Sequence, residues 1–220
     1  YGLGELLGQL NGDVVVGLGG SATVDGGLGL LRAMGGTFVD NNGHPIEHAR
    51  DLVRLARASL PTLPCAVTVA VDVQQALQGC ARIFGPQKGA SDDDIELLEA
   101  GLARLAEVID PDKRHRTRPG SGAAGGVGFA LSVLGAELRP GVDVVLDAVN
   151  FDALLSNADL VVTGEGRLDA QSALGKVVAG VARRCASTQT PCVAVVGALL
   201  DGWDPLLDDG LTAAFSLAPG

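Results

Sequence analysis

The chain has 220 residues, 47% of them hydrophobic but only 3% aromatic, and a formal net charge of −10. This length supplies a sizeable core, and the acidic balance argues against nucleic acid or an anionic membrane as the main partner. The four cysteines form no C-x-x-C pair, so we expect reduced, buried thiols in a cytoplasmic protein. The uncharged segment 119–136 contains six glycines, so we do not expect it to span a membrane.

Hydrophobic periodicity predicts strands that alternate with helices, which favours an α/β fold with a mostly parallel sheet. The clearest helix begins after Ser91, with three aspartates in its first turn. In the first half we expect a helix over 2–10, a strand over 13–17, a helix that ends at 35–36, a hairpin over 37–46, a helix over 47–58, a strand over 65–71 and the helix that reaches Ile109. In the second half we expect helices over 126–134, within 142–155 and over 177–185, and strands over 159–163, 192–197 and 212–217.

The segment Val14–Gly27, VVVGLGGSATVDGG, is the most informative part of the chain. A buried strand runs into a loop with almost no side-chain bulk, and a helical pattern follows. Backbone N–H groups in such a loop are free to touch a ligand, and a helix N-terminus favours negative charge. The loop therefore predicts a site for a phosphate or a small carboxylate. The alternative is a tight strand-to-helix turn that needs glycine for its positive φ angles.

Three further glycine-rich loops follow, namely FGPQKGA at 84–90, PGSGAAGGVG at 119–128 and TGEGRLDAQSALGK at 163–176. Ligands of parallel sheets lie at the carboxyl ends of strands, where the sequence places the first and the fourth loop. Phosphoryl transfer needs amides and cations for the phosphate oxygens, and carboxylates that hold Mg²⁺ or take the proton of the acceptor. We expect the four loops to meet at one crevice, around Gly19, Lys88, Gly125 and Glu165.

A second interpretation rests on Gly17-x-Gly19-x-x-Ala22, which follows a strand and precedes a helix. Together with Asp40, which ends a candidate strand some twenty residues later, it formally matches a dinucleotide-binding fingerprint. This match favours an NAD(P)-dependent oxidoreductase. Asp40 fits equally well into a turn with Asn41 and Gly43. No Walker A pattern is present in the sequence.

Taken in this order, the loops resemble the type I glycerate kinase family. The matching segments are GLGGSATVDGG at 17–27, VDVQ at 71–74, FGPQKGA at 84–90, PGSGAAGGVG at 119–128, LGAELRPGVDVVLDAV at 134–149, DLVVTGEGRLDAQSALGK at 159–176 and AAFSLAPG at 213–220. The resemblance implies a kinase that phosphorylates glycerate with ATP and Mg²⁺, in bacteria typically to 2-phosphoglycerate. It leaves the oligomeric state open.

The resemblance also implies two α/β lobes with mostly parallel sheets and flanking helices, and an active site in the cleft between them. Residues 1–155 would form an inserted lobe, and residues 156–220 the C-terminal part of a Rossmann-like lobe. Family members extend beyond both ends of this sequence, so we expect the Rossmann-like lobe to lack its front strands here. A non-catalytic anion-binding fragment is therefore a third interpretation.

The charged residues of these loops are the candidate catalytic groups. Lys88 is expected to reach a phosphate or the glycerate carboxylate as a compact point charge. Glu165 and Asp169 follow a buried strand, and either one suits the acceptor of the hydroxyl proton or a ligand of Mg²⁺. For Asp169 the alternative is a helix cap, and Arg167 either holds the acceptor carboxylate or pairs with these acids. Further expected contacts to substrate or nucleotide are Gly19, Gly20, Ser21, Thr23, Asp25, Asp72, Gln87, Ser121, Gly122, Gly125 and Gly164. For Ser21 and Asp25 the alternative is capping of the following helix.

Overall fold

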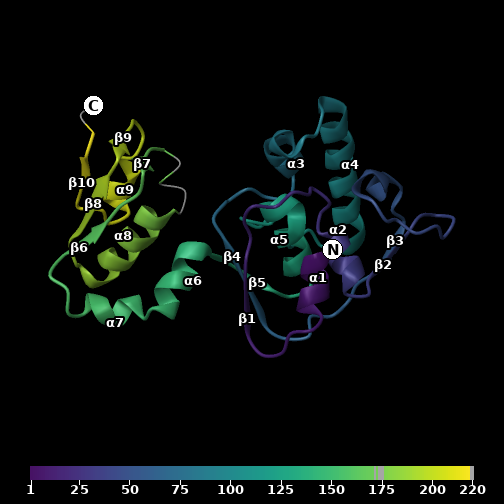
Figure 1. Ribbon diagram of the computed structural model, residues 1–220, viewed down its shortest axis with the longest axis horizontal. Helices are drawn as coiled ribbons and strands as arrows, with labels where there is room; N and C mark the ends of the chain where they lie inside the picture. Colours follow the sequence, from purple (N-terminus) through teal and green to yellow (C-terminus); the bar gives the residue numbers. More distant parts are fainter. Residues whose placement is uncertain (171, 173–175, 219–220) are drawn as a thin grey trace. The chain divides into compact units, whose positions relative to one another are not determined.

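A computed structural model describes residues 1–170, 172 and 176–218 (Figure 1). It divides into two compact units, Tyr1–Arg139 and Pro140–Gly220, which are described in turn. Both units combine small, mostly parallel sheets with helices, so the predicted α/β class is confirmed. In the described part of the chain no helix is both long and apolar enough to cross a membrane.

The first unit is built on a three-stranded sheet in the order β1-β4-β5. Strands β1 and β4 run parallel, with Val14 opposite Val67 and Gly17 opposite Ala70. The three valines of β4 are buried and alternate with the half-buried Thr68 and Ala70, the pattern of a strand that packs mainly through one face. Both strands fall where the apolar runs predicted them. The bounds are β1 (Val14–Gly17), β4 (Val67–Val71) and β5 (Glu137–Pro140).

Helices pack around this sheet, and α4 is the longest of those in the first unit. A capping box fixes its start, because Ser91 Oγ accepts from the Asp94 N–H and the Asp94 carboxylate accepts from the Ser91 N–H. The predicted helix after Ser91 is therefore confirmed, and its buried face includes Leu102 and Leu105. The helices are α1 (Gly2–Leu7), α2 (Leu28–Ala33), α3 (Cys80–Phe84), α4 (Asp92–Ile109) and α5 (Ala123–Val133), with the 3₁₀ helices η1 (Ala49–Arg54) and η2 (Pro86–Lys88).

The prediction of a helix over 47–58 was wrong. The segment forms η1 and then β3 (Arg57–Ser59), which pairs antiparallel with β2 (Thr37–Val39). In a 3₁₀ turn, residues three apart lie on the same side, and this geometry buries Leu52 and Leu55 together, each only 1% exposed. Tertiary packing thus overrides local helix propensity.

The predicted hairpin over 37–46 is reduced to a single antiparallel bridge between Val39 and Pro45. Asp40 belongs to its turn, where its carboxylate accepts from the backbone N–H groups of Asn42 and His44. These two bonds, at 2.8 and 2.9 Å, commit the carboxylate to local structure. Asp40 is 7% exposed, so it does not present a free carboxylate to a ribose.

The second unit contains a three-stranded parallel sheet in the order β10-β8-β6. Helix α8 packs with the sheet in one core, through Val178 and Ala182 on the helix and Ala194 and Val196 on β8. A short parallel pair, β7 and β9, adjoins the loop that follows β6. The bounds are β6 (Val161–Thr163), β7 (Arg167–Leu168), β8 (Cys192–Val196), β9 (Ala198–Leu199), β10 (Ala213–Ser216), α6 (Gly141–Ala148), α7 (Phe151–Leu155), α8 (Val177–Thr188) and α9 (Pro205–Asp208).

The division between the units falls at Arg139–Pro140, earlier than the predicted boundary after residue 155. Helices α6 and α7 belong to the second unit because Arg184 on α8 holds both of them. Its guanidinium donates to Asp147 at 2.6 Å and to Asp152 at 2.8 Å. The sequence pattern predicts the helices but gives no sign of this ion-pair network. The boundary between the two units therefore lies at the start of α6 and not after α7.

Candidate functional site

The first glycine-rich loop joins the end of β1 to α2, and its two ends differ in character. At Gly19 and Gly20 an added Cβ would meet no atom within 4 Å, and Gly20 has a φ angle of +61°. The backbone at these two glycines is therefore open. At Gly27, by contrast, an added Cβ would lie 2.4 Å from the Cβ of Ala130. The absence of a side chain gives a ligand access at the start of the loop and permits close packing at its end.

The third glycine-rich loop packs directly on the first. The Gly26 N–H donates to the Gly125 carbonyl at 2.9 Å. A Cβ on Gly125 would lie 2.1 Å from the Thr23 carbonyl oxygen, and one on Gly126 would lie 2.6 Å from the Gly26 Cα. The two loops thus meet, as predicted, but Gly125 serves the contact between them.

A pocket of about 180 Å³ opens at the carboxyl ends of β1 and β4. Parallel sheets bind ligands at this edge. Six of the residues expected from the sequence line it together, namely Gly19, Gly20, Ser21, Asp72, Gln87 and Lys88. The other lining residues are Leu18, Val73, Phe84 and Ala124. The structure therefore brings the first and second glycine-rich loops and the end of β4 to one small, partly polar pocket.

Lys88 lies at the centre of these contacts. Its Nζ donates to Ser21 Oγ at 2.8 Å and to the Thr23 carbonyl at 2.7 Å. Partial burial lowers the pKa of the Lys88 ammonium, against smaller opposing effects from Cys80 and Asp25. An ammonium has three N–H donors, and these contacts occupy two of them. No other described residue accepts from the third donor, so it is available to an anion.

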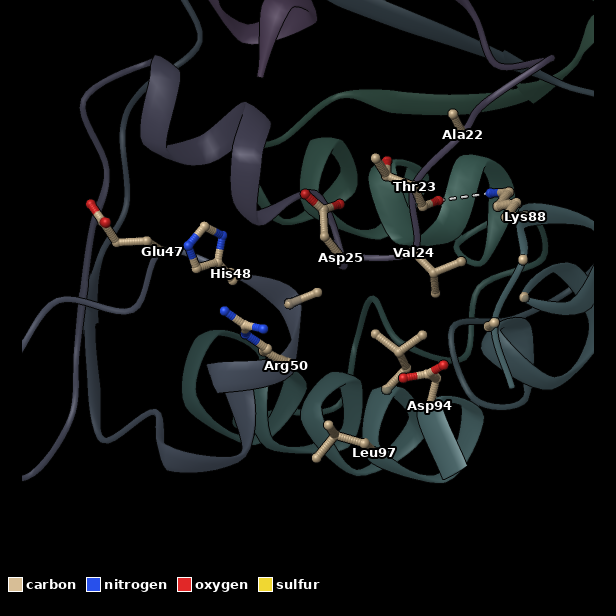
Figure 2. Close-up of a pocket in the computed structure, with 15 residues that line it drawn as sticks. Ala22, Thr23, Val24, Asp25, Glu47, His48, Arg50, Lys88, Asp94 and Leu97 are labelled. Carbon is tan, nitrogen blue, oxygen red and sulfur yellow. Dashed lines mark hydrogen bonds between the residues drawn. The ribbon is translucent and has the colours of Figure 1, made fainter. Parts of the chain in front are cut away.

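A larger pocket, of about 630 Å³, lies beside the same loop and also includes Lys88. Figure 2 shows Lys88 on one side of it and His48 and Arg50 on the other, with Asp25 and Val24 between them. Four of its lining residues, namely His48, Arg50, Asp94 and Leu97, were not expected from the sequence. The incorrect helix over 47–58 hid the first two, and the helical pattern after Ser91 presented the others only as parts of α4.

Asp25 adopts the structural role that the sequence left open. Its two carboxylate oxygens accept from the N–H groups of Gly27 and Gly29, each at 2.9 Å, at the start of α2. A carboxylate at this position satisfies free helix N–H groups and complements the helix dipole. Asp25 also lines the larger pocket, and both of its carboxylate oxygens already accept hydrogen bonds from the backbone.

Ser121 and Gly122 were expected to contact a ligand, but their surroundings make them structural. Ser121 is 0% exposed, donates through Oγ to the Arg116 carbonyl and accepts from the Leu77 N–H. A Cβ on Gly122 would lie 2.3 Å from the Ala76 carbonyl oxygen. Neither residue lines the pockets described above. The third loop packs closely against the segment after β4, and this packing leaves neither residue open to a ligand.

The fourth loop lies in the second unit, at the carboxyl end of β6. Arg167 Nε pairs with Asp169 Oδ2 at 2.9 Å, so Arg167 adopts the alternative role of pairing with an acid. Asp169 Oδ1 accepts from the Ser172 N–H at 3.3 Å. This contact is of the kind that a capping role for Asp169 predicts. A Cβ on Gly164 would lie 2.2 Å from the Val195 carbonyl oxygen, so Gly164 is required for strand packing.

Glu165 differs from its neighbours in this loop. Its Oε1 is buried and has no hydrogen-bond partner among the described residues. Buried polar atoms are nearly always paired, so this oxygen is a candidate ligand for a hard cation. The described residues contain no group of three or more His, Cys, Asp or Glu side chains placed to hold a metal. Mg²⁺ commonly uses one or two carboxylates together with substrate phosphates, and Glu165 fits that requirement better than the paired Asp169.

The pattern Gly17-x-Gly19-x-x-Ala22 lacks the structural context that a dinucleotide-binding fingerprint requires. Helix α2 begins at Leu28, well after Ala22, whereas the fingerprint requires a helix that opens at the loop. The acidic residue of the pattern, Asp40, is held in a turn. The oxidoreductase interpretation is therefore not supported by either of its two features.

Comparisons with known proteins agree with the loop pattern. All 220 residues match the glycerate kinase family. Glycerate kinase of Halalkalibacterium halodurans is 39% identical over all of this chain and 62% of its own length, and glycerate 2-kinase of Escherichia coli K12 is 38% identical over 93% of this chain and 57% of its own. A crystal structure from Salmonella typhimurium LT2, of a protein assigned as glycerate kinase 2, superposes with a TM-score of 0.70. It is 39% identical, over 93% of this chain and 56% of that one. The chain thus spans about three fifths of the length of these relatives.

Proposed function

The chain belongs to the glycerate kinase family, and we propose that the complete protein transfers the γ-phosphoryl group of ATP to a hydroxyl of glycerate, giving 2-phosphoglycerate. The observation that carries the proposal is the pocket of about 180 Å³ in which Gly19, Gly20, Ser21, Asp72, Gln87 and Lys88 meet. A water molecule takes about 30 Å³, so this pocket holds about six water-sized groups. That is the scale of a three-carbon hydroxy acid.

In this pocket Lys88 supplies positive charge, and the open backbone at Gly19 and Gly20 allows a ligand to approach closely. Charge-assisted contacts of this kind bind a carboxylate or a phosphate. Asp72 is an exposed carboxylate at the end of β4, where it would orient the acceptor hydroxyl. Positioning and charge stabilisation account for most of the catalysis in phosphoryl transfer.

The reaction forms a bond between the γ-phosphorus and the glycerate oxygen and breaks the bond from that phosphorus to the bridging oxygen of ADP. The hydroxyl proton passes to a carboxylate, for which we propose Asp72. Mg²⁺, when bound, neutralises charge on the transferring phosphates. We propose Glu165 as its protein ligand in the second unit because Oε1 of Glu165 is buried without a described partner.

The net charge of −10 supports a small-molecule substrate and not a nucleic acid. Three of the four free cysteines are buried. Free buried thiols suit the reducing cytoplasm, where we place the reaction. Burial raises the pKa of the Cys80 and Cys192 thiols to about 12, so neither is a reactive thiolate at neutral pH.

The test is release of ADP by the full-length protein in the presence of D-glycerate, ATP and Mg²⁺. Addition of enolase identifies the product, because enolase converts 2-phosphoglycerate directly and leaves 3-phosphoglycerate unchanged. We expect turnover with D-glycerate and an immediate enolase signal. ADP release no faster than in ATP alone contradicts the kinase proposal, and turnover without an enolase signal contradicts the 2-phosphoglycerate product.

A further inference from the structure

Two pockets of different size share Lys88. The smaller one, of about 180 Å³, lies on the side of Asp72 and Gln87. The larger one, of about 630 Å³, lies on the side of Thr23, Arg50 and Leu97. Thus Lys88, which is fixed by two hydrogen bonds to the first glycine-rich loop, contributes to the walls of both.

The sizes suit two different ligands. At about 30 Å³ for each water molecule, the larger pocket holds about twenty water-sized groups. Pockets for cofactors and other organic ligands commonly measure about 300–1,000 Å³. A three-carbon acid would leave most of this volume to water, whereas the base and sugar of a nucleotide would fill it.

Three acids line the larger pocket, but its donors without local partners favour an anion. The carboxylate of Asp25 accepts from helix N–H groups, that of Asp94 belongs to the capping box, and that of Glu47 pairs with Arg32 at 2.6 Å. By contrast, no hydrogen bond or ion pair joins the side chain of His48 or of Arg50 to another of the described residues. The oxygens of these acids are therefore engaged by local donors, and the donors of the pocket that remain available are Arg50, His48 and Lys88.

Apart from Thr23, the rest of the wall is formed by apolar residues and glycines. Val24 is buried, and Leu97 and Leu98 project from α4 toward the pocket (Figure 2 labels Val24 and Leu97). An apolar surface of this kind covers one face of a planar base, while nearby cations meet the negative charge of the phosphates. The larger pocket thus combines apolar and cationic elements in the way that a nucleotide requires.

We propose that the larger pocket binds the nucleotide donor, with the base against Val24 and Leu97 and the phosphates between Arg50 and Lys88. The small acid occupies the smaller pocket, so that Lys88 stands where donor and acceptor meet. This assignment rests on the proposed kinase function and gives each ligand its own set of residues. Its consequence is that substitutions in the larger pocket change the use of the nucleotide and leave the use of the acid unchanged.

The experiment compares variants of the full-length protein. Leu97→Glu places a negative charge on the apolar wall, and Ala100→Glu adds the same charge at an exposed position of α4 outside the pocket. Arg50→Gln removes a cation of the pocket, and Arg57→Gln removes an exposed one on β3. All four positions are solvent-exposed, so each variant should fold.

We expect Leu97→Glu and Arg50→Gln to raise the KM for ATP at least about tenfold, while the KM for glycerate stays within about twofold. The two control variants should leave both constants unchanged. Calorimetric titration with ADP and Mg²⁺ provides a readout independent of turnover, and the Kd should rise in parallel with the KM for ATP. An unchanged Kd and KM for the nucleotide in both pocket variants, with an active wild-type enzyme, overturns this assignment.

Failure of the proposed function has a different signature. A wild-type protein that binds ADP but does not phosphorylate glycerate overturns the kinase proposal. If Leu97→Glu then abolishes ADP binding and Ala100→Glu does not, the larger pocket is still the nucleotide site. If the pocket variants raise the KM for glycerate and not that for ATP, the two pockets have the opposite ligands and the proposal is wrong.

Discussion

The ammonium of Lys88 donates a 2.8 Å hydrogen bond to the hydroxyl of Ser21, across 67 positions of sequence. This contact ties η2 to the glycine-rich loop after β1, and a second bond reaches the Thr23 carbonyl. Lys88 therefore has two roles in the proposed site. It supplies charge to a ligand and it fixes the open backbone that the ligand approaches.

Replacement of Lys88 with alanine should reduce kcat/KM for glycerate phosphorylation by more than about tenfold, the cost of one lost charge-assisted contact. Lys113→Ala is the matched control, because Lys113 is an exposed lysine outside both pockets. Steady-state assays of the full-length protein give the comparison. Normal kinetics in Lys88→Ala remove this residue from the site.

The contact between Lys88 and Ser21 should also be visible as coupling in stability. Unfolding of the wild type, Ser21→Ala, Lys88→Ala and the double variant forms a cycle that isolates the pair. We expect a coupling free energy of about 1 kcal/mol, the scale of a partly exposed hydrogen bond to a charged group. Denaturant titration followed by circular dichroism measures it. A coupling near zero shows that the loop keeps its position without the ammonium.

Several elements were predictable because one physical signal dominates each of them. Strands β1, β4, β6, β8 and β10 are short apolar runs that end in glycine, polar or turn residues, and such runs are typical of buried parallel strands. The capping box and apolar face of α4 are equally local signals. The positions of Asp72 and the first glycine-rich loop at the carboxyl ends of strands were predictable for the same reason, since each directly follows a predicted strand.

The features that the sequence did not indicate depend on contacts between distant segments. The 3₁₀ helix η1 replaces an α-helix because Leu52 and Leu55 pack together in the core. Gly125 fits against the Thr23 carbonyl, a contact that composition cannot distinguish from an approach to a ligand. The larger pocket combines residues of η1, η2, α4 and the adjoining loops. Its members from η1 and α4, such as Arg50 and Leu97, are exposed residues that carry no signal of a site in the sequence.

Two glycine substitutions separate packing from ligand contact. Gly125→Ala should lower the free energy of unfolding by at least about 2 kcal/mol, because the residue has a φ angle of +67° and its Cβ would lie 2.1 Å from a carbonyl oxygen. Gly19→Ala has open space around its Cβ, so its stability should change by less than about 1 kcal/mol. Its kcat/KM should nevertheless fall about tenfold or more, since the added methyl group displaces a ligand.

Denaturant titration and steady-state kinetics on both variants make this comparison. A Gly19→Ala protein with full activity means that no ligand approaches that backbone. A Gly125→Ala protein as stable as the wild type means that the two loops do not pack as described.

Removal of Mg²⁺ tests the role proposed for Glu165. Glu165→Gln keeps the size of the side chain and removes its charge, so the Mg²⁺ concentration for half-maximal activity should rise at least about tenfold. Asp169→Asn is the comparison, because the Asp169 carboxylate is already paired with Arg167. A Mg²⁺ titration of activity in each variant measures the shift. A larger shift in Asp169→Asn than in Glu165→Gln assigns the metal to the other carboxylate.

Stability in acid should depend on Asp110, a 3% exposed carboxylate at the end of α4. Burial alone would raise its pKa, but the N–H groups of Arg116, His115 and Arg114 outweigh burial and hold the pKa below the ordinary value of 3.8. A carboxyl group whose folded pKa is lowered stabilises the fold above its unfolded pKa, and this contribution is lost as pH falls through the folded pKa.

Asp110→Asn should therefore lower the free energy of unfolding at pH 7 by about 1–3 kcal/mol, the scale of hydrogen bonds to a charged group. The difference from wild type should shrink as the pH falls below about 4. Asp112→Asn is the control, because Asp112 is exposed and lies 3.7 Å from Arg114 in a surface pair, worth less than about 1 kcal/mol. Urea titrations at pH 7 and pH 3 test this. If the difference in free energy of unfolding between wild type and Asp110→Asn were the same at both pH values, the variant would be destabilised by altered packing and not by the loss of a charged acceptor.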